Sequence, residues 1–232
     1  MLSQDEYKSK IMEITPGRLH PLLKGIYRTV IPENESIKTI DYMQSVPETL
    51  PDKHIRNVSI HPSREEMLTT LPTEGKVAEL GVDEGNFSEQ ILSITEPESL
   101  FLVDVWETER YGEEEMRKVK KKFDDLAEVS IVRERSEIAL SEFEDDFFDL
   151  VYIDTTHSYE QTSKELYVSQ RKVKEDGVIA GHDYCVGNVS KGVPYGVISA
   201  VHEFCIQENW QISHLSLETD GYRSFALEKI NS

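Results

Sequence analysis

The pattern of hydrophobic and polar positions changes near residue 74. From Gly75 onward, short apolar runs rich in β-branched and aromatic residues alternate with longer amphipathic segments. Short runs bounded by glycine or charged residues are typical of buried parallel strands. The predicted strands are Lys76–Leu80, Leu100–Val105, Val129–Val132, Phe148–Ile153 and Val178–Ala180. The predicted helices between them are Asn86–Ile94, Glu113–Leu126, Glu137–Phe143 and Ser158–Val173.

The C-terminal part of the pattern predicts an antiparallel strand. After a helix at Tyr195–Gln207, the strand-like segments Gln211–Leu217 and Arg223–Leu227 flank the turn Thr219-Asp220-Gly221. Asp-Gly between two alternating segments is a hairpin signal. Strands that alternate with helices imply right-handed crossovers and a sheet covered on both faces. We therefore expect an α/β, Rossmann-like fold with a mostly parallel sheet and an antiparallel terminal strand from a C-terminal hairpin.

Residues 1–74 have a different pattern of hydrophobic and polar positions. Short amphipathic helices are predicted at Glu6–Ile14 and Arg18–Tyr27, and the proline-interrupted stretch Pro32–Pro62 has weak strand signals. We expect residues 1–74 to form a helical or irregular N-terminal segment that caps the site or makes an oligomer contact. Residues 75–232 would form the domain built on the sheet.

Composition points to a soluble protein of the cytoplasm. Hydrophobic residues make up 38% and charged residues 30% of the chain, as in globular proteins. No apolar run approaches the roughly 20 residues that span a bilayer, and the first residues lack the features of an export signal. Cys185 and Cys205 are too few for a disulfide scaffold or a zinc site, which favours a reducing compartment.

The net charge narrows the range of partners. Lys and Arg total 25 against 44 Asp and Glu, which gives a formal charge of −19. A surface this acidic repels phosphate backbones and anionic lipid. We therefore expect a small neutral or cationic molecule as the partner, and neither nucleic acid nor a membrane.

The first predicted strand leads into a loop suited to a ligand. Gly81 and Gly85 bracket a tight turn, where the absence of Cβ lets a ligand approach the backbone. Asn86 with Glu89 fits an N-terminal helix cap, so backbone N–H groups would point into the crevice towards an anionic group. An ordinary glycine-containing turn is the alternative.

The second predicted strand suggests what that ligand is. Asp104 follows Gly85 by 19 residues, about the spacing at which a carboxylate receives ribose hydroxyls; a solvated strand-end aspartate is the alternative. The loop lacks the third glycine of a dinucleotide fingerprint, and its acids Asp83 and Glu84 would repel a pyrophosphate. They tolerate an ammonium and a sulfonium, so S-adenosylmethionine is favoured over NAD.

Two later strand ends carry polar groups that suit catalysis. Asp154 and His157 precede the helix that begins near Ser158, and His182 with Asp183 follow the next strand. Adjacent strands lie about 4.8 Å apart, so these side chains can converge. His157 could act as a general base, kept neutral by the helix N-terminus; a role as a helix cap is the alternative.

The same groups could hold a divalent cation. Carboxylates of Asp154 and Asp183 suit such an ion, which would orient an acceptor hydroxyl and lower its pKa. His182 would be the third ligand. An imidazole suits softer metals, or no metal at all.

These motifs resemble a known family. From about Lys76 to Glu228 the sequence is similar to class I S-adenosylmethionine-dependent methyltransferases. It resembles the small-molecule and sugar O-methyltransferase branches, which carry I-D-x-x-H-S-Y-E and G-H-D-Y segments, here Ile153–Glu160 and Gly181–Tyr184. The resemblance implies a seven-stranded sheet with an antiparallel last strand, and residues 75–232 as the methyltransferase domain. It also implies a homodimer.

The resemblance further implies a set of cofactor contacts. Glu79 would lie near the amino group, Gly81 and Gly85 under the methionine part, Asp104 on the ribose, and Ser136 by the adenine unless it is only a helix cap. The remaining members of the implied set are Val82, Asn86, Phe87, Val105 and Asp154. Family members that use Mg or Mn generally have carboxylate or amide groups where this chain has His182-Asp183.

The function that this implies is O-methylation of a small hydroxylated molecule, with or without a metal. Two alternatives stay open: an NAD-dependent oxidoreductase, and a non-catalytic cofactor-binding module of the same fold. The terminal hairpin and the acidic loop argue against the first alternative. The Asp/His cluster argues against the second.

Overall fold

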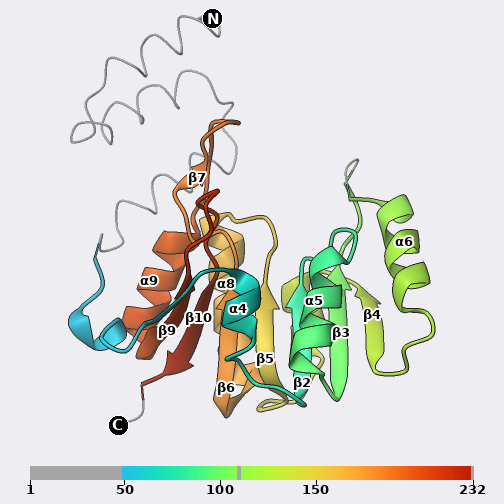
Figure 1. The fold of residues 1–232 in the computed structure, drawn as a ribbon, viewed down its shortest axis with the longest axis horizontal. Coiled ribbons are helices and arrows are strands. Elements are labelled where there is room, and N and C mark those ends of the chain that lie inside the picture. The colour runs from blue at the N-terminus through green and yellow to red at the C-terminus, as the bar shows by residue number, and fades with distance from the viewer. Residues whose placement is uncertain (1–48, 109–110, 231–232) are drawn as a thin grey trace, which may run out of the picture.

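The computed structural model describes residues 49–108 and 111–230 (Figure 1). The helices predicted at Glu6–Ile14 and Arg18–Tyr27 lie outside the described residues. The described part begins with a 3-10 helix, η2 (Asp52–His54), a short strand, β1 (Ser59–His61), and a short helix, α4 (Arg64–Leu68). Although these elements precede residue 74, β1 pairs with the sheet and α4 packs against it.

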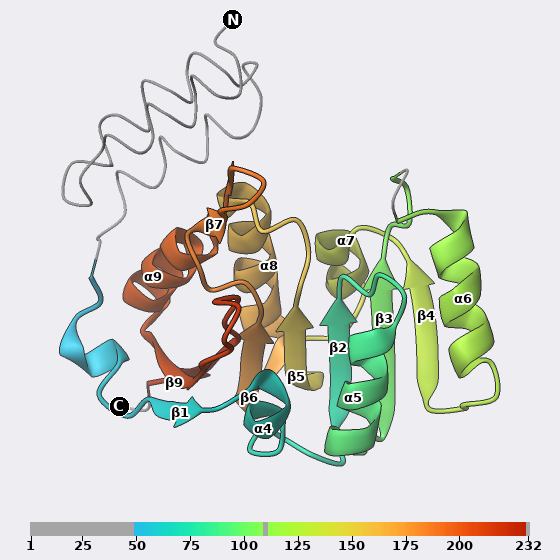
Figure 2. The same ribbon diagram turned by 45° about the horizontal axis from the view of Figure 1, so that its top comes forward.

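The centre of the molecule is an eight-stranded sheet of order β1-β9-β10-β6-β5-β2-β3-β4 (Figure 2). Its remaining strands are β2 (Lys76–Leu80), β3 (Ser99–Asp104), β4 (Val129–Arg133), β5 (Phe148–Ile153), β6 (Val173–Gly181), β9 (Trp210–Ser216) and β10 (Phe225–Lys229). β10 lies antiparallel between β6 and β9, and the other pairs are parallel. The antiparallel strand is thus confirmed, and β1 adds an eighth strand to the seven expected.

Helices cover both faces of the sheet, as expected. On one face α7 (Ser136–Ser141), α8 (Tyr159–Lys172) and α9 (Val197–Glu208) bury side chains in one hydrophobic cluster. On the other face α4, α5 (Asn86–Thr95) and α6 (Glu113–Phe123) contribute to a second cluster. Two short strands, β7 (Gly187–Asn188) and β8 (Val193–Pro194), form a hairpin after β6.

Several predicted details differ from the structure. β6 begins at Val173 rather than Val178, because polar residues in its first half hide it from the hydrophobic pattern. The Asp-Gly turn lies within the longer connection 217–224, where Gly221 N donates to Glu218 O at 3.1 Å. The residue that caps α5 is Gly85 and not Asn86, and its φ of 72° is left-handed.

The sheet order predicts a ligand crevice at the ends of β2 and β5. The chain runs outward from β2 through β3 to β4, then returns to β5 on the other side of β2. Ligands of open α/β sheets bind at such a reversal, beyond the carboxyl ends of the strands. The four loops that follow β2, β3, β5 and β6 therefore meet at one edge.

Two further findings concern the whole fold. None of the helices in the described part of the chain is long and apolar enough to cross a membrane. Cys185 and Cys205 are both free thiols, and both are buried.

Candidate active site

The loop after β2 requires glycine at both predicted positions. Gly81 has a φ of +87°, and a Cβ there would lie 2.0 Å from the carbonyl oxygen of Asp154. A Cβ at Gly85 would lie 2.9 Å from Cε2 of Phe123. No side chain caps α5, so its first N–H groups have no side-chain acceptor. This end of the helix is therefore available to an anionic group.

Asp104 ties this loop to the next one. Its Oδ2 accepts hydrogen bonds from the backbone nitrogens of Val82 at 2.8 Å and Asp83 at 3.2 Å. Its Oδ1 accepts one from Trp106 N at 3.0 Å. The sequence did not reveal this structural role. Ribose binding by Asp104 stays a prediction, and each oxygen has further lone-pair capacity for it.

The acids within the first loop face different surroundings. Glu84 pairs with Lys118 of α6 at 2.9 Å, so its charge is balanced outside the crevice. The carbonyl of Asp83 accepts a hydrogen bond from the indole of the fully buried Trp106. The argument against a pyrophosphate therefore rests on the missing third glycine and Asp83 more than on Glu84.

Glu79 is a buried acid beneath the crevice. Its carboxylate accepts a hydrogen bond from Ser88 Oγ of α5, and only 1% of the residue is exposed. Burial raises the pKa of Glu79 to about 8, and Asp154 adds to the rise although Ser88 opposes it. Among the other implied cofactor residues, Val82 and Phe87 are buried, and the carbonyl of Val105 accepts from Arg133 Nε at 3.1 Å.

Ser136 belongs to a buried polar network. It is the first residue of α7, and Arg135 precedes it as the cap residue, so the cap alternative for Ser136 is wrong. Its hydroxyl donates to Glu165 of α8, and Gln161 Nε2 donates to both, at 3.0 and 2.9 Å. Thr155, next to Asp154, donates to the other oxygen of Glu165 at 2.8 Å. The network connects the adenine loop expected from the sequence with the loop after β5.

Glu165 should make stability depend on pH. Burial raises its pKa to about 7 from 4.5, against the opposing hydrogen bonds of Gln161, Ser136 and Thr155. A raised carboxyl pKa lets the unfolded chain lose its proton first, so stability falls as pH rises from about 4.5 to about 7. Glu165→Gln should therefore raise the free energy of unfolding by about 1–3 kcal/mol at pH 8 and change it little near pH 4.5. Urea denaturation at both pH values measures this difference.

The matched control for this variant is Glu160→Gln. Glu160 lies on the same helix but is exposed and pairs with Lys164. It should show no pH-dependent difference of this size. A stability change in Glu165→Gln that is equal at both pH values would contradict the account.

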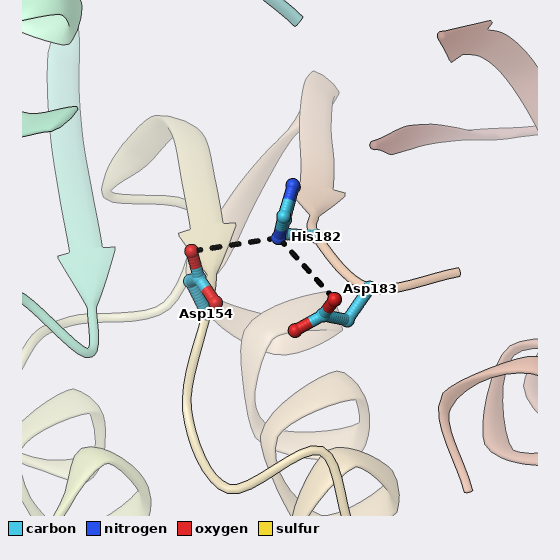
Figure 3. Close-up of side chains that lie close together, drawn as sticks. All are labelled: Asp154, His182 and Asp183. Carbon is cyan, nitrogen blue, oxygen red and sulfur yellow. Dashed lines mark ion pairs between the residues drawn. The ribbon is translucent and has the colours of Figure 1, made fainter. Parts of the chain in front are cut away.

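The loops after β5 and β6 bring together all four polar residues predicted there. Figure 3 shows His182 between the two aspartates: its Nδ1 lies 3.8 Å from Asp154 Oδ2 and 3.6 Å from Asp183 Oδ1. One ligand atom from each of the three residues lies within 4.8 Å of the others. These are the three residues that the sequence suggested as metal ligands.

His157 completes the cluster from the loop after β5. Its Nε2 lies 3.1 Å from Asp183 Oδ2, and its ring centroid lies 4.7 Å from that of Tyr195. His157 and Asp183 both have positive φ, 58° and 60°. Of the eight non-glycine residues with positive φ in the described part of the chain, four lie in the loops that meet at this edge: Asp83, Trp106, His157 and Asp183. Such strain concentrates at functional sites.

The cluster shifts the pKa values of two of its members. Burial raises the pKa of Asp154, although His182 and His157 oppose the shift. Burial alone would lower the pKa of His182, but Asp183 and Asp154 together raise it. Both shifts favour the protonated forms of Asp154 and His182.

Arg64 is a site residue that the sequence analysis missed. It is the first residue of α4, and its Nη1 lies 3.9 Å from Asp154 Oδ2. Ser63 caps this helix by accepting from Glu66 N at 3.3 Å, and Ser63 with Glu66 is a capping pattern that can be seen in the sequence. That pattern predicts the start of the helix, but not the contact with a residue 90 positions later.

Part of the chain is similar to known proteins. Residues 78–184 match a family model described as a methyltransferase domain. No curated protein matches the chain. A putative rRNA-methylase from Clostridium thermocellum is similar in structure, with 14% identity, a TM-score of 0.55, and 75% of this chain and 100% of that chain covered.

Two further structures are similar. A putative methyltransferase from Streptococcus mutans in complex with SAH has 12% identity and a TM-score of 0.53, with 72% of this chain and 96% of that chain covered. A spermidine synthase in complex with the transition-state analogue AdoDATO has 19% identity and a TM-score of 0.50, with 71% of this chain covered. The match spans 58% of that synthase.

The family match and the fold support each other. Residues 78–184, a little under half of the chain, match a methyltransferase domain. The described part of the chain has an α/β, Rossmann-like fold similar to that of the solved methyltransferase structures.

Proposed function

We propose that the protein transfers a methyl group from S-adenosylmethionine to a hydroxyl oxygen of a small molecule. The observation that carries the proposal is the convergence of Asp154, His157, His182 and Asp183 beside the crevice, with His157 held by Asp183 at 3.1 Å. Transfer to a hydroxyl requires that the acceptor oxygen lose a proton. A positioned imidazole is the side chain best matched to that task near neutral pH.

Each side chain of the cluster would have a separate role in the transfer. The cofactor supplies an electrophilic methyl group on its sulfonium. With Nε2 protonated and bound to Asp183, His157 keeps the Nδ1 lone pair that takes the hydroxyl proton. Asp183 fixes this tautomer and balances the positive charge that develops on the ring. Asp154, directly after β5, would stand between the acceptor side and the cofactor side of the crevice.

A divalent cation would fit the same cluster. Two carboxylates and one imidazole, with ligand atoms within 4.8 Å of one another, suit Mn²⁺ better than Mg²⁺, which prefers oxygen ligands. Asp154, His182 and Asp183 would hold it. Its chemistry would be to orient the acceptor and lower the pKa of the hydroxyl. Asp183 would serve both arrangements, because its Oδ2 faces His157 and its Oδ1 faces His182.

The acceptor class follows from charge. With a formal charge of −19, the protein disfavours polyanions. A small neutral or cationic hydroxylated molecule, such as a sugar or secondary metabolite, is therefore proposed, although an rRNA-methylase is among the similar structures. Action in the cytoplasm and a homodimer belong to the same proposal.

A binding experiment can distinguish both alternative functions from the proposed one. An oxidoreductase would bind NAD, and a non-catalytic module would bind the cofactor without turning it over. The missing third glycine of the loop after β2 argues against the first. The second would have no use for strained residues at His157 and Asp183.

Calorimetric titration of the full chain tests the proposal. S-adenosylhomocysteine should bind with micromolar affinity and NAD should not. Binding of NAD alone would refute the proposed cofactor. In a second titration, Mn²⁺ should bind the wild-type protein, and Asp183→Asn should abolish that binding while it keeps the affinity for S-adenosylhomocysteine.

The control for the metal titration is Asp176→Asn, which removes an exposed acid from β6. It should leave Mn²⁺ binding unchanged. Equal Mn²⁺ affinities in the wild type and Asp183→Asn would show that the cluster holds no metal, and His157 alone would then activate the acceptor.

A further inference from the structure

We propose that Arg64 binds the carboxylate of the cofactor's methionine group, so that α4, which precedes the matched domain, completes the cofactor site. The inference rests on the proposed cofactor, but it concerns a residue outside the family match and outside the set that the sequence suggested. It assigns a specific chemical partner to one guanidinium.

The guanidinium lies where the methionine group is expected. Arg64 Cζ stands 3.9 Å from the centroid of the Phe87 ring. Phe87 is the second residue of α5, directly after the glycine loop. On its other side, Arg64 faces Asp154 across 3.9 Å. The charge of Arg64 therefore lies between the start of α5 and the loop that follows β5.

The donors of Arg64 are not used within the described part of the chain. Its two ion pairs, with Glu65 at 3.8 Å and Asp154 at 3.9 Å, are both longer than the 2.7–3.2 Å of an N–H···O hydrogen bond. No hydrogen bond joins the guanidinium to another described residue. Only 25% of the side chain is exposed. A guanidinium offers five donors, and leaving them unmet when it is largely buried is costly.

The charge pattern of the crevice matches an amino-acid zwitterion. Glu79 is bonded to Ser88 of α5, and the backbone of Asp154 lies against Gly81, so these two acids suit the ammonium group of the cofactor. The carboxylate of the same group needs a positive partner, which Arg64 provides from α4. The uncapped start of α5 adds backbone N–H groups beside it. Arg64 can hold a carboxylate through two parallel hydrogen bonds.

The competing account is that Arg64 only attaches α4 to α5. Its contact with the Phe87 ring is a cation–π interaction, and Met67 and Leu68 of the same helix are completely buried. A purely structural arginine would affect all ligands of the crevice alike. An arginine that binds the carboxylate affects only ligands that possess one.

A pair of ligands separates these accounts. One probe is S-adenosylhomocysteine, and the other is its decarboxylated analogue, which retains the adenosine, the thioether and the amine. Calorimetry with the wild-type chain should show about 10- to 100-fold tighter binding of the first probe. Arg64→Gln should weaken the binding of S-adenosylhomocysteine by the same factor. It should leave the affinity for the analogue within about threefold of the wild-type value. Arg64→Lys keeps the charge but loses the two parallel hydrogen bonds, so its affinity for S-adenosylhomocysteine should lie between those of the wild type and Arg64→Gln.

Arg56→Gln is the matched control. Arg56 is exposed and pairs with Asp52 near η2, at 3.0 Å, and the variant should bind both probes as the wild type does. Binding of the analogue also reports that the crevice of each variant is intact. The inference would be overturned if Arg64→Gln weakened the binding of both probes equally, or weakened the binding of neither. Failure of the wild type to bind S-adenosylhomocysteine would instead count against the cofactor itself.

Discussion

Replacing His157 with Asn should lower kcat for methyl transfer by about 10²- to 10⁴-fold, the usual contribution of a positioned general base. Asparagine has no basic nitrogen, and it tolerates the left-handed φ of 58° at this position better than most residues. The affinity for S-adenosylhomocysteine should change little, because His157 contacts Asp183 and Tyr195 rather than the glycine loop. The measurement is the rate of S-adenosylhomocysteine release with a hydroxylated acceptor found by screening.

His61→Gln is the control for this experiment. His61 lies on the short edge strand β1 and bonds to His214 at 2.8 Å, away from the Asp/His cluster, so its loss should leave kcat within about twofold of the wild type. If His157→Asn turned over as fast as the wild-type protein, His157 would not be the base. The proton would then have to leave through Asp154 or through water.

The sequence predicted the sheet well because its strands are local features. The bounds of β2 and β5 match the apolar runs that predicted them, since a strand buried on both faces is mostly apolar. β1 escaped prediction because it has only three residues and none of them is buried. The first half of β6 escaped for a related reason, because Glu175 and Asp176 are exposed. Periodicity detects burial, and these segments pair without being buried.

The candidate site was predictable only where its residues follow strands. Asp154, His157, His182 and Asp183 could be grouped because β5 and β6 are successive in the chain and adjacent in the sheet. Arg64 could not be grouped with them, because it reaches Asp154 through the packing of α4 beside α5. The partners of Glu165 were hidden for the same reason: nothing local in α8 indicates contact with Ser136 or Thr155.

Gly81→Ala should have the largest effect on folding. A Cβ at this residue would lie 2.0 Å from the carbonyl oxygen and 2.6 Å from the carbonyl carbon of Asp154, and both are backbone atoms that cannot turn aside. Relief would require β2 and β5 to separate, although Asp154 N donates to Leu80 O at 2.8 Å there. We expect a loss of more than about 3 kcal/mol in the free energy of unfolding, measured by urea denaturation. Binding of S-adenosylhomocysteine should be lost as well, because the loop that carries Gly81 would be displaced.

Gly221→Ala separates the steric clash of a Cβ from the conformational penalty of a left-handed φ. Gly221 has nearly the same φ, +86°, but a Cβ there would meet nothing within 4 Å. It should therefore show only the conformational penalty, about 1 kcal/mol, with unchanged binding of S-adenosylhomocysteine. The difference between the two variants measures how closely the backbone after β2 approaches that after β5. If Gly81→Ala were as mild as Gly221→Ala, the two loops would be able to move apart freely, and the crevice would not be the fixed site on which both the cofactor contacts and the position of Asp154 depend.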